Sequence, residues 1–366
     1  NRGTCSSPND ACVPQNKATE GNGAFFEPED ASYASSGYCV PRSVLEDMEY
    51  SNVVANTLSL IDKEEFNKEE EMTESYYHNQ PQYDQHHRQL DSLNCTSFCS
   101  GERQDVSSYK GPFNSLTNCY INGNCRTDYP DISCWNTADI TDMKDAFSNQ
   151  YFNAPLECWD VGQVTSMDRM FFYVSSFNQL IDSWDVSKVE NMGYMFSGAT
   201  FFNQPLDSWD VSQVEYMDGM LQDATYFNQP IDSWDVSQVK DMDDMFYQAL
   251  KFNQPIDSWD VSQVDSMRFM FSSATPFNQP IGDWNTSQVR KMDYMFYMAT
   301  SFNQPLDTWN VSQVEDMNVM FYEARSFNQC LSTWAEKTSD IVNTTRMLIA
   351  TQCRNRNPDA LSLIHI

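Results

Sequence analysis

The sequence is poor in basic residues. It contains 22 Lys and Arg against 52 Asp and Glu, which gives a formal net charge of −30 at pH 7. Proteins bind nucleic acids through clustered Lys and Arg that neutralise the phosphates, so this deficit argues against a nucleic-acid partner. The same excess of negative charge disfavours anionic membrane surfaces and favours cations or basic proteins as partners.

Long apolar runs are also missing. No run approaches the ~18 apolar residues of a membrane span, so the sequence predicts no transmembrane segment. The chain begins at Asn1 without a Met or an apolar leader, as a mature secreted protein would. Eleven Cys agree with a secreted or cell-surface location. So do the Asn-x-Ser/Thr glycosylation sequons at Asn94, Asn285, Asn310 and Asn343.

The sequence carries no recognisable catalytic motif. We find no nucleophile elbow, phosphate loop, zinc motif or His placed against a nucleophile, and therefore predict that the protein is not an enzyme. His78, His86 and His87 fall in one segment, but no Cys, His or Asp grouping there has metal-ligand spacing. We interpret these histidines as solvated or hydrogen-bonded rather than as metal ligands.

The sequence is dominated by one repeated unit. A Phe-Asn pair recurs every 25 residues from Phe152 to Phe327. All nine tryptophans fall on one position of this unit, namely Trp135, Trp159, Trp184, Trp209, Trp234, Trp259, Trp284, Trp309 and Trp334. A fixed period of this size indicates a solenoid or a comparable array.

Each repeat contains two patterns. Residues 205–211 follow a proline and carry β-branched and aromatic side chains, which predicts a short strand. Ser212 and Glu215 then form a capping box, and Met217 and Met220 follow at helical spacing, which predicts about three helical turns. The expected fold is an α/β repeat solenoid of the leucine-rich-repeat type, with about nine strand–helix rungs over residues 131–350.

The regions on either side of the repeats differ in composition. Residues 1–130 are Cys-rich and form a disulfide-rich, partly helical N-terminal region, in which a capping box at Ser43 begins a long helix over about 43–72. Residues 351–366 form a C-terminal cap with an apolar, strand-prone tail. An apolar tail on so acidic a chain is a candidate assembly contact, through Leu361, Leu363, Ile364 and Ile366.

The cysteines allow predictions of pairing. Cys134 and Cys158 each precede a Trp in consecutive rungs, so we predict a disulfide between them. A second bridge, between Cys330 and Cys353, would staple the C-terminal cap. Seven cysteines remain between Cys5 and Cys125, so one is free or bonds to another chain, and their pairing stays open.

Two ladders of aspartates run along the array. One comprises Asp182, Asp207, Asp232, Asp257 and Asp307, and the other Asp185, Asp210, Asp235 and Asp260. Stacked carboxylates either bind a hard cation, with calcium as the candidate cofactor, or cap turns by accepting backbone hydrogen bonds. The lack of a glycine-anchored calcium loop favours turn capping. In the second ladder Asn285 and Asn310 replace Asp and create two of the sequons.

The repeat resembles a known family. Its motif, Met-x-x-Met-Phe-x-x-Ala-x-x-Phe-Asn-Gln-Pro-Leu-x-x-Trp-Asp-Val-Ser-x-Val, is similar to the bacterial-surface-protein repeats, also called mycoplasma lipoprotein-associated repeats, which are relatives of BspA-like leucine-rich repeats. The resemblance covers residues ~133–350. It implies a right-handed solenoid and surface roles such as adhesion, and it implies no catalytic residues.

These patterns lead to two functional hypotheses. The first is a secreted, glycosylated structural protein that builds an extracellular filament or surface layer through its solenoid ends, N-terminal region and tail. The alternative is a monomeric cell-surface adhesin or receptor that binds a glycan or a protein on the solenoid face. Its recognition surface would comprise varied positions such as Tyr216, Lys240, Asp241, Arg268, Phe269, Arg290, Lys291 and Tyr322.

Overall fold

A computed structural model gives the fold of the chain. It describes the backbone of residues 10–14 and 37–41, then residue 99 and residues 103–351 except 107–108, 110, 126–127, 130, 330, 335–336 and 339–341. The predicted helix over 43–72, the three histidines, Asn94, the Cys330–Cys353 bridge and the apolar tail lie outside the described residues. The chain divides into two compact units, residues 1–93 and 94–366. The boundary expected near residue 130 therefore falls inside the second unit.

The described part of the first unit is a strand pair. β1 (Asp10–Pro14) and β2 (Gly37–Pro41) run antiparallel, and Cys12 lies opposite Cys39 in their register.

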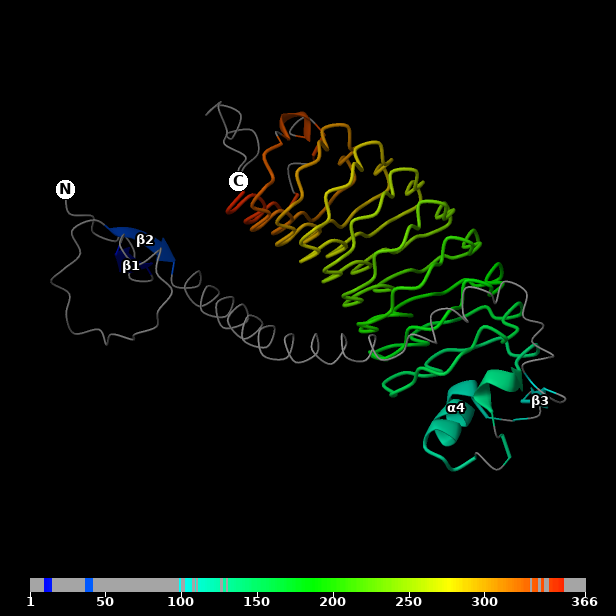
Figure 1. The fold of residues 1–366 in the computed structure, drawn as a ribbon. Coiled ribbons are helices and arrows are strands. Elements are labelled where there is room, and N and C mark those ends of the chain that lie inside the picture. Colours follow the sequence, from blue (N-terminus) through cyan, green and yellow to red (C-terminus); the bar gives the residue numbers. More distant parts are fainter. Residues whose placement is uncertain are drawn as a thin grey trace, which may run out of the picture. The chain divides into compact units, whose positions relative to one another are not determined.

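The second unit is a stack of coils, one coil for each sequence repeat (Figure 1). Successive coils are joined by isolated parallel bridges at the residue just before the first Met of the repeat, such as Asn191–Tyr216 and Tyr216–Asp241. In the described part of the chain these bridges run without interruption from Asp142 to Asn343. The sequence repeat and the structural repeat are thus the same unit.

Neither the helical turns nor the short strand at 205–211 that we predict within each repeat is formed. Residues 217–220 and 221–224 are instead two consecutive turns, closed by hydrogen bonds of 3.2 Å from Met220 N–H to Met217 O and from Ala224 N–H to Leu221 O. The third residue of each turn has a positive φ, 57° at Gly219 and 54° at Asp223. An α-helix cannot continue through left-handed residues. Two four-residue turns bury residues at the same spacing as a helix, which explains why the spacing of the Met residues predicts a helix that is not formed.

These turns bond to the next coil along the stack. The N–H groups of alternate residues donate to carbonyls of the following coil at 2.7–3.1 Å, from Met217 to Asp241, Gly219 to Asp243, Leu221 to Met245 and Asp223 to Tyr247. The two left-handed residues are among the donors. Left-handed φ costs a non-glycine residue roughly 1–2 kcal/mol, and the ladder of inter-coil hydrogen bonds offsets that cost.

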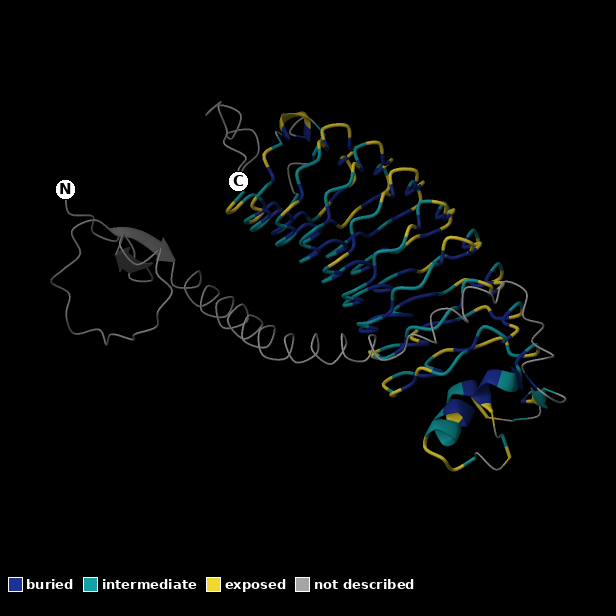
Figure 2. Cartoon of the chain, viewed as in Figure 1, coloured by how far each residue is buried: buried dark blue, intermediate teal, exposed yellow. Residues whose placement is uncertain are grey.

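The interior of the stack consists of columns of identical side chains. Trp234 and Trp259 stack with ring centroids 6.3 Å apart, and Phe202 and Phe227 with centroids 6.0 Å apart. Each indole N–H from Trp159 onward donates to a carbonyl of the preceding coil, as from Trp209 to Ile181 at 3.1 Å. Figure 2 shows buried residues recurring at the same places in every coil and exposed residues at the bends.

A second column is formed by the asparagines of the Phe-Asn-Gln motif. Asn203 Oδ1 accepts the backbone N–H of Asn228 at 3.0 Å and Gln229 Nε2 at 3.1 Å. The same arrangement recurs from Asn153 to Asn303. These asparagines therefore satisfy backbone N–H groups of the next coil.

The N-terminal end of the stack is closed by helix α4 (Phe113–Ile121). Phe113 and Tyr120 meet the ring of Trp135 edge-on at 6.3 and 5.4 Å, and Thr117 Oγ1 donates to the Ala146 carbonyl of the first coil. β3 (Gln104–Asp105) pairs in parallel with β4 (Trp135–Asn136), which follows the short 3₁₀ helix η2 (Ile132–Cys134).

The packing at this end of the stack also determines which cysteines form disulfides there. Cys134 is bonded to Cys99, and Cys119 to Cys125. The predicted Cys134–Cys158 bridge is therefore wrong, although Cys158 also belongs to a disulfide. The segment before the repeats folds onto the first coil and brings Cys99 to within 5.6 Å of Cys134 between Cα atoms, which repeat spacing alone does not reveal.

The stack continues to the last described coil, residues 342–351. Trp334, at the end of the 3₁₀ helix η3 (Ser332–Trp334), stacks on Trp309 at 6.2 Å. Met317 and Phe321 donate to Asn343 and Met347 at 2.8 and 2.9 Å.

Candidate interaction face

One of the two aspartate ladders predicted from the sequence caps turns. Asp210 Oδ1 accepts the N–H of Ser212 two residues later at 3.1 Å, and Asp185, Asp235 and Asp260 do the same. Hydrogen bonds from Ser187 and Ser237 lower the pKa of Asp185 and Asp235 below the ordinary value. Because these carboxylates are occupied locally, each stabilises its own bend.

The other ladder joins neighbouring coils. Asp232 Oδ1 accepts the N–H and the hydroxyl of Ser258 in the next coil at 3.2 and 2.8 Å, and Asp182 accepts the N–H of Ser208 at 3.3 Å. The carbonyls of Asp207 and Asp307 accept hydroxyls of the following coil. Within the described residues, no group of three or more His, Cys, Asp or Glu side chains lies close enough to hold a metal ion.

Three of the four sequon asparagines are described, and all three are exposed. Asn285 and Asn310 accept the N–H of Ser287 and Ser312 at 3.2 and 3.1 Å, as the aspartates they replace do. Asn343 accepts the hydroxyl of Thr345 at 2.8 Å.

The varied residues of the repeat gather on another surface. We call it the turn face; it comprises the outward side chains of the stacked segments 142–149, 166–173, 191–198, 216–223, 241–248, 266–273, 291–298, 316–323 and 343–350. Tyr216, Asp241, Arg268, Phe269 and Lys291 lie on it, as expected of the predicted recognition surface. Lys240 and Arg290 stand beside it, paired with Glu215 at 2.6 Å and Asp265 at 2.9 Å.

A column of charged side chains on the turn face lies at the position directly after the first Met of the repeat. Lys144 pairs with Asp168, and Arg268 Nε lies 3.0 Å from both carboxylate oxygens of Asp293. The two acceptors are buried, at 8 % and 6 % exposure, while the cations are partly exposed. Each pair links adjacent coils.

Between these ion pairs lies an acidic region. Burial raises the pKa of Asp218, Asp241 and Asp243, and it raises that of Asp244 to about 6, with help from the neighbouring Asp243 carboxylate. Burial, followed by the charge of Asp218, also raises the pKa of Tyr194 to about 12. The central coils are therefore negative and only partly solvated.

Aromatic side chains occupy both ends of the turn face. Phe269 stacks on Tyr294 at 4.6 Å, and Tyr297 stacks on Tyr322 at 5.6 Å. Because these rings face one another along the stack, their edges and hydroxyls are what they present outward. Nearer the N-terminal end, the ring of Tyr194 lies over Gly219, with a ring carbon 2.4 Å from where a Cβ would stand.

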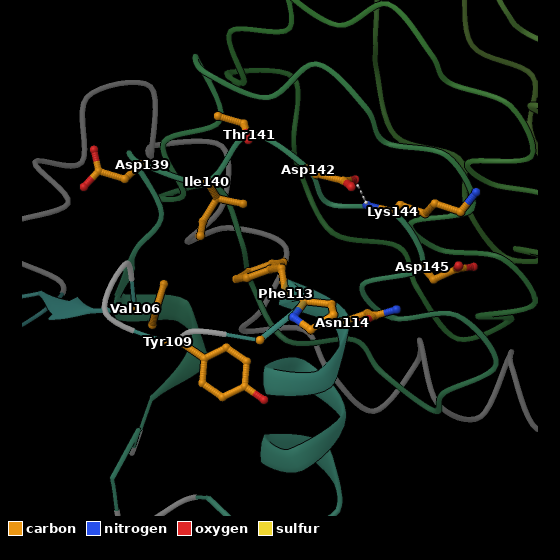
Figure 3. Close-up of a pocket in the computed structure, with 12 residues that line it drawn as sticks. Val106, Tyr109, Phe113, Asn114, Asp139, Ile140, Thr141, Asp142, Lys144 and Asp145 are labelled. Atoms are coloured by element: carbon orange, nitrogen blue, oxygen red, sulfur yellow. Dashed lines mark hydrogen bonds between the residues drawn. The ribbon is translucent and has the colours of Figure 1, made fainter.

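Two adjoining hollows lie where the turn face meets the closed end. The first, of about 510 Å³, lies between the start of α4 and the first coil (Figure 3). In that view the apolar side chains of Val106, Phe113 and Ile140 lie in the middle, with Asp139 on one side and Asp142 and Asp145 on the other. The sequence did not reveal this hollow, because residues before the repeats contribute half of it.

The second hollow, of about 410 Å³, shares Asp145 with the first. It is lined further by Ser148, Asn149, Arg169, Phe172 and Tyr194. The Arg169 guanidinium lies 6.0 Å from the Tyr194 ring centroid and 3.8 Å from Asp168. Asp168 is engaged mainly by Lys144, and Arg169 lines the second hollow.

Comparison with known proteins identifies the repeats. Residues 114–230, 180–276 and 252–360 match the family model described as Mycoplasma protein of unknown function, DUF285. No curated protein and no solved structure matches the chain. Among the described helices, none is long and apolar enough to cross a membrane.

Proposed function

Because the chain belongs to the DUF285 family of mycoplasma-type repeat proteins, whose description names no activity, we propose its function from the surface of its own coils. The protein is a secreted, glycosylated, non-enzymatic binding protein. Its coils form a solenoid related to BspA-like leucine-rich repeats, and its turn face recognises a protein partner. The observation that carries this proposal is the contrast between repeated core residues and varied turn-face residues.

The contrast has a physical basis. Met217, Met220, Ala224 and Phe227 are fully buried, and the equivalent residues of neighbouring coils are buried too. Close packing requires side chains of the same shape at the equivalent position of each coil, which explains why the same residues recur at the buried positions. The turn-face positions between them change among Lys, Asp, Gly and Arg from coil to coil. A varied surface on a rigid scaffold is typical of binding proteins.

The chemistry of the turn face favours a protein over a glycan. Sugars bind aromatic rings through exposed ring faces, whereas Phe269 and Tyr294 pack their faces against each other. Ring edges, Tyr hydroxyls and partly exposed Arg side chains are instead typical of protein interfaces.

Site-specific photocrosslinking tests the proposal. A benzoylphenylalanine placed at Tyr216, on the turn face, should crosslink to a protein in the extracellular material of the producing cells. The same group at the exposed Gln213, beyond the capping turn, serves as the control. Crosslinking confined to Tyr216 and suppressed by an excess of unlabelled protein is expected. Equal crosslinking from both positions, or from Gln213 alone, would contradict a role for the turn face.

Self-association is a second candidate function, favoured by the two ends of the stack. Helix α4 covers the N-terminal end, whereas the N–H groups of Thr344, Leu348 and Ala350 in the last coil donate to no described residue. A second chain could pair with these donors. Continuous filaments need two complementary ends, so this arrangement favours a dimer. Light scattering after size exclusion should then give a dimer mass, and longer polymers would contradict it.

A further inference from the structure

The two hollows share one lining residue, Asp145, and we call them together the end groove. Its first part has an apolar floor. Val106 and Phe113 are 1 % and 7 % exposed, and the partly buried Ile140 packs against the same core. An apolar side chain entering here would meet Ile140 and the small exposed part of Phe113, with the polar Asn114 and Thr141 beside them.

The rim of the end groove carries unbalanced negative charge. Asp139 and Asp142 are exposed and Asp145 is half-buried. None of the three forms an ion pair with a described residue; Asp142 Oδ1 only accepts the N–H of Lys144 at 2.9 Å. Lys144 lines the same rim, but its ammonium group is paired with Asp168, which raises the pKa of Lys144. The three rim carboxylates thus outnumber Lys144, whose ammonium group is engaged by Asp168.

The second part of the end groove offers hydrogen-bond donors. Arg169 lines it beside Phe172 and Tyr194, and its guanidinium lies over the Tyr194 ring. Peptide carbonyls accept such donors readily. A peptide lying along the end groove would thus lie first beside Ile140, then beside the rim carboxylates, and then beside Arg169 with its aromatic neighbours.

We propose that the end groove binds an extended basic segment of the protein partner. An apolar side chain of that segment fills the first hollow, neighbouring Lys or Arg side chains pair with Asp139, Asp142 and Asp145, and its backbone carbonyls accept from Arg169. Charge complementarity carries the choice of occupant, since the groove rim and the whole chain, at −30, both favour a basic partner. The inference rests on the proposed function, because it specifies which partner segment the turn face recognises.

Binding of synthetic peptides to the full chain tests the inference. The probe is a fluorescent hexapeptide that alternates Lys with Val, and the comparison peptides replace Lys by Glu or Val by Ser. Fluorescence anisotropy should show binding of the Lys–Val peptide, no binding of the Glu peptide and weaker binding of the Ser peptide. Equal binding of the Lys–Val and Glu peptides would overturn the proposal.

A matched pair of variants locates the site. Asp139→Asn, Asp142→Asn and Asp145→Asn together should weaken Lys–Val peptide binding about tenfold, since three exposed ion pairs are lost. The control combines Asp182→Asn, Asp207→Asn and Asp232→Asn, which removes the same charge from the ladder elsewhere on the coils and should change affinity less than about twofold. Equal losses would mean non-specific attraction and would overturn the proposal.

Other outcomes separate this inference from the proposed function. If Tyr216 crosslinks a partner and the groove variant leaves that crosslink and the peptide affinity unchanged, the end-groove inference fails while the proposed function stands. If Tyr216 gives no specific crosslink, the proposed function fails. If the groove variant converts a dimer to a monomer, the occupant is a second copy of the chain, and the inference of a basic partner segment is wrong.

Discussion

At the scale of single residues, much of the cohesion between coils comes from polar side chains that bond one step along the stack. The asparagine column is the clearest case, because each side chain satisfies a backbone N–H of the next coil. Asn203 Oδ1 accepts both the Asn228 N–H and Gln229 Nε2. A buried N–H that loses its acceptor is left with a desolvation penalty.

Replacing one such asparagine should therefore be costly. Asn203→Ala removes the acceptor for Asn228 N–H and should lower the free energy of unfolding by about 1–3 kcal/mol. Urea denaturation followed by tryptophan fluorescence measures this change. Gln213→Ala, at an exposed position, is the control and should stay within about 0.5 kcal/mol of the parent. Similar effects of both substitutions would show that the asparagine column does not join the coils.

The acidic residues of the turn face predict a pH dependence. Burial raises the pKa of Asp244 from its ordinary value of 3.8 to about 6. A carboxyl whose pKa is raised in the folded state opposes folding when it is ionised, so its penalty appears as the pH rises from about 4 to 6 and is absent below both values. Asp244→Asn should therefore raise the melting temperature at pH 7.5 and leave it nearly unchanged at pH 3.5.

Asp235 provides a control of opposite sign. Hydrogen bonds from Ser237 lower its pKa, so its ionised form stabilises the fold at neutral pH and this contribution is lost as the pH falls. Asp235→Asn should not raise the melting temperature at pH 7.5. The same upward shift in both variants would indicate general relief of charge repulsion rather than burial of Asp244.

At the scale of the element, the repeated turn pair replaces the helix that the spacing of Met217 and Met220 suggests. Gly219 occupies one left-handed position, and the Tyr194 ring lies where its side chain would be. Other coils place Tyr194, Asp244 or Phe269 at the equivalent position with φ between 53° and 56°. The backbone therefore tolerates side chains there, and the close approach of Tyr194 accounts for glycine in this coil.

Gly219→Ala should consequently destabilise the protein by displacing Tyr194. The expected loss is about 1–2 kcal/mol in the free energy of unfolding, measured by urea denaturation. In a Tyr194→Ala background the additional cost of Gly219→Ala should shrink to about 1 kcal/mol or less. Gly162→Ala, whose Cβ would contact only Asp185 and Asp160 side chains, is the control. An undiminished cost in the Tyr194→Ala background would refute the steric explanation.

At the scale of the whole molecule, the chain carries a net charge of −30, and among the described residues no group of three or more His, Cys, Asp or Glu could hold a metal ion. The ladder carboxylates that suggested calcium accept hydrogen bonds from Ser side chains and backbone instead, such as Asp232 from Ser258. Repulsion between them is moderated by these bonds and by screening in salt.

Removal of divalent cations should leave the stack intact. The melting temperature should be the same with EDTA and with calcium at equal ionic strength, because the ladder carboxylates cap turns rather than bind an ion. Sodium chloride at about 0.15 M should raise the melting temperature over low salt by screening like charges. Stabilisation by calcium beyond that of a matched sodium concentration would restore the cation hypothesis.

The sequence by itself determined the repeat unit and which positions of each repeat are buried, and it favoured turn capping over cation binding for Asp185, Asp210, Asp235 and Asp260. These features follow from local periodicity and from contacts between residues one repeat apart, so they can be recognised in the amino-acid sequence alone. The local conformation was only partly determined, because two left-handed turns bury residues at the same spacing as a helix. Tertiary structure decided the rest. It placed α4 over Trp135, paired Cys134 with Cys99, and brought Val106 and Phe113 beside Asp142 and Asp145. These residues lie on both sides of the boundary between repeated and non-repeated sequence, and only the packing of one segment on the other creates the groove.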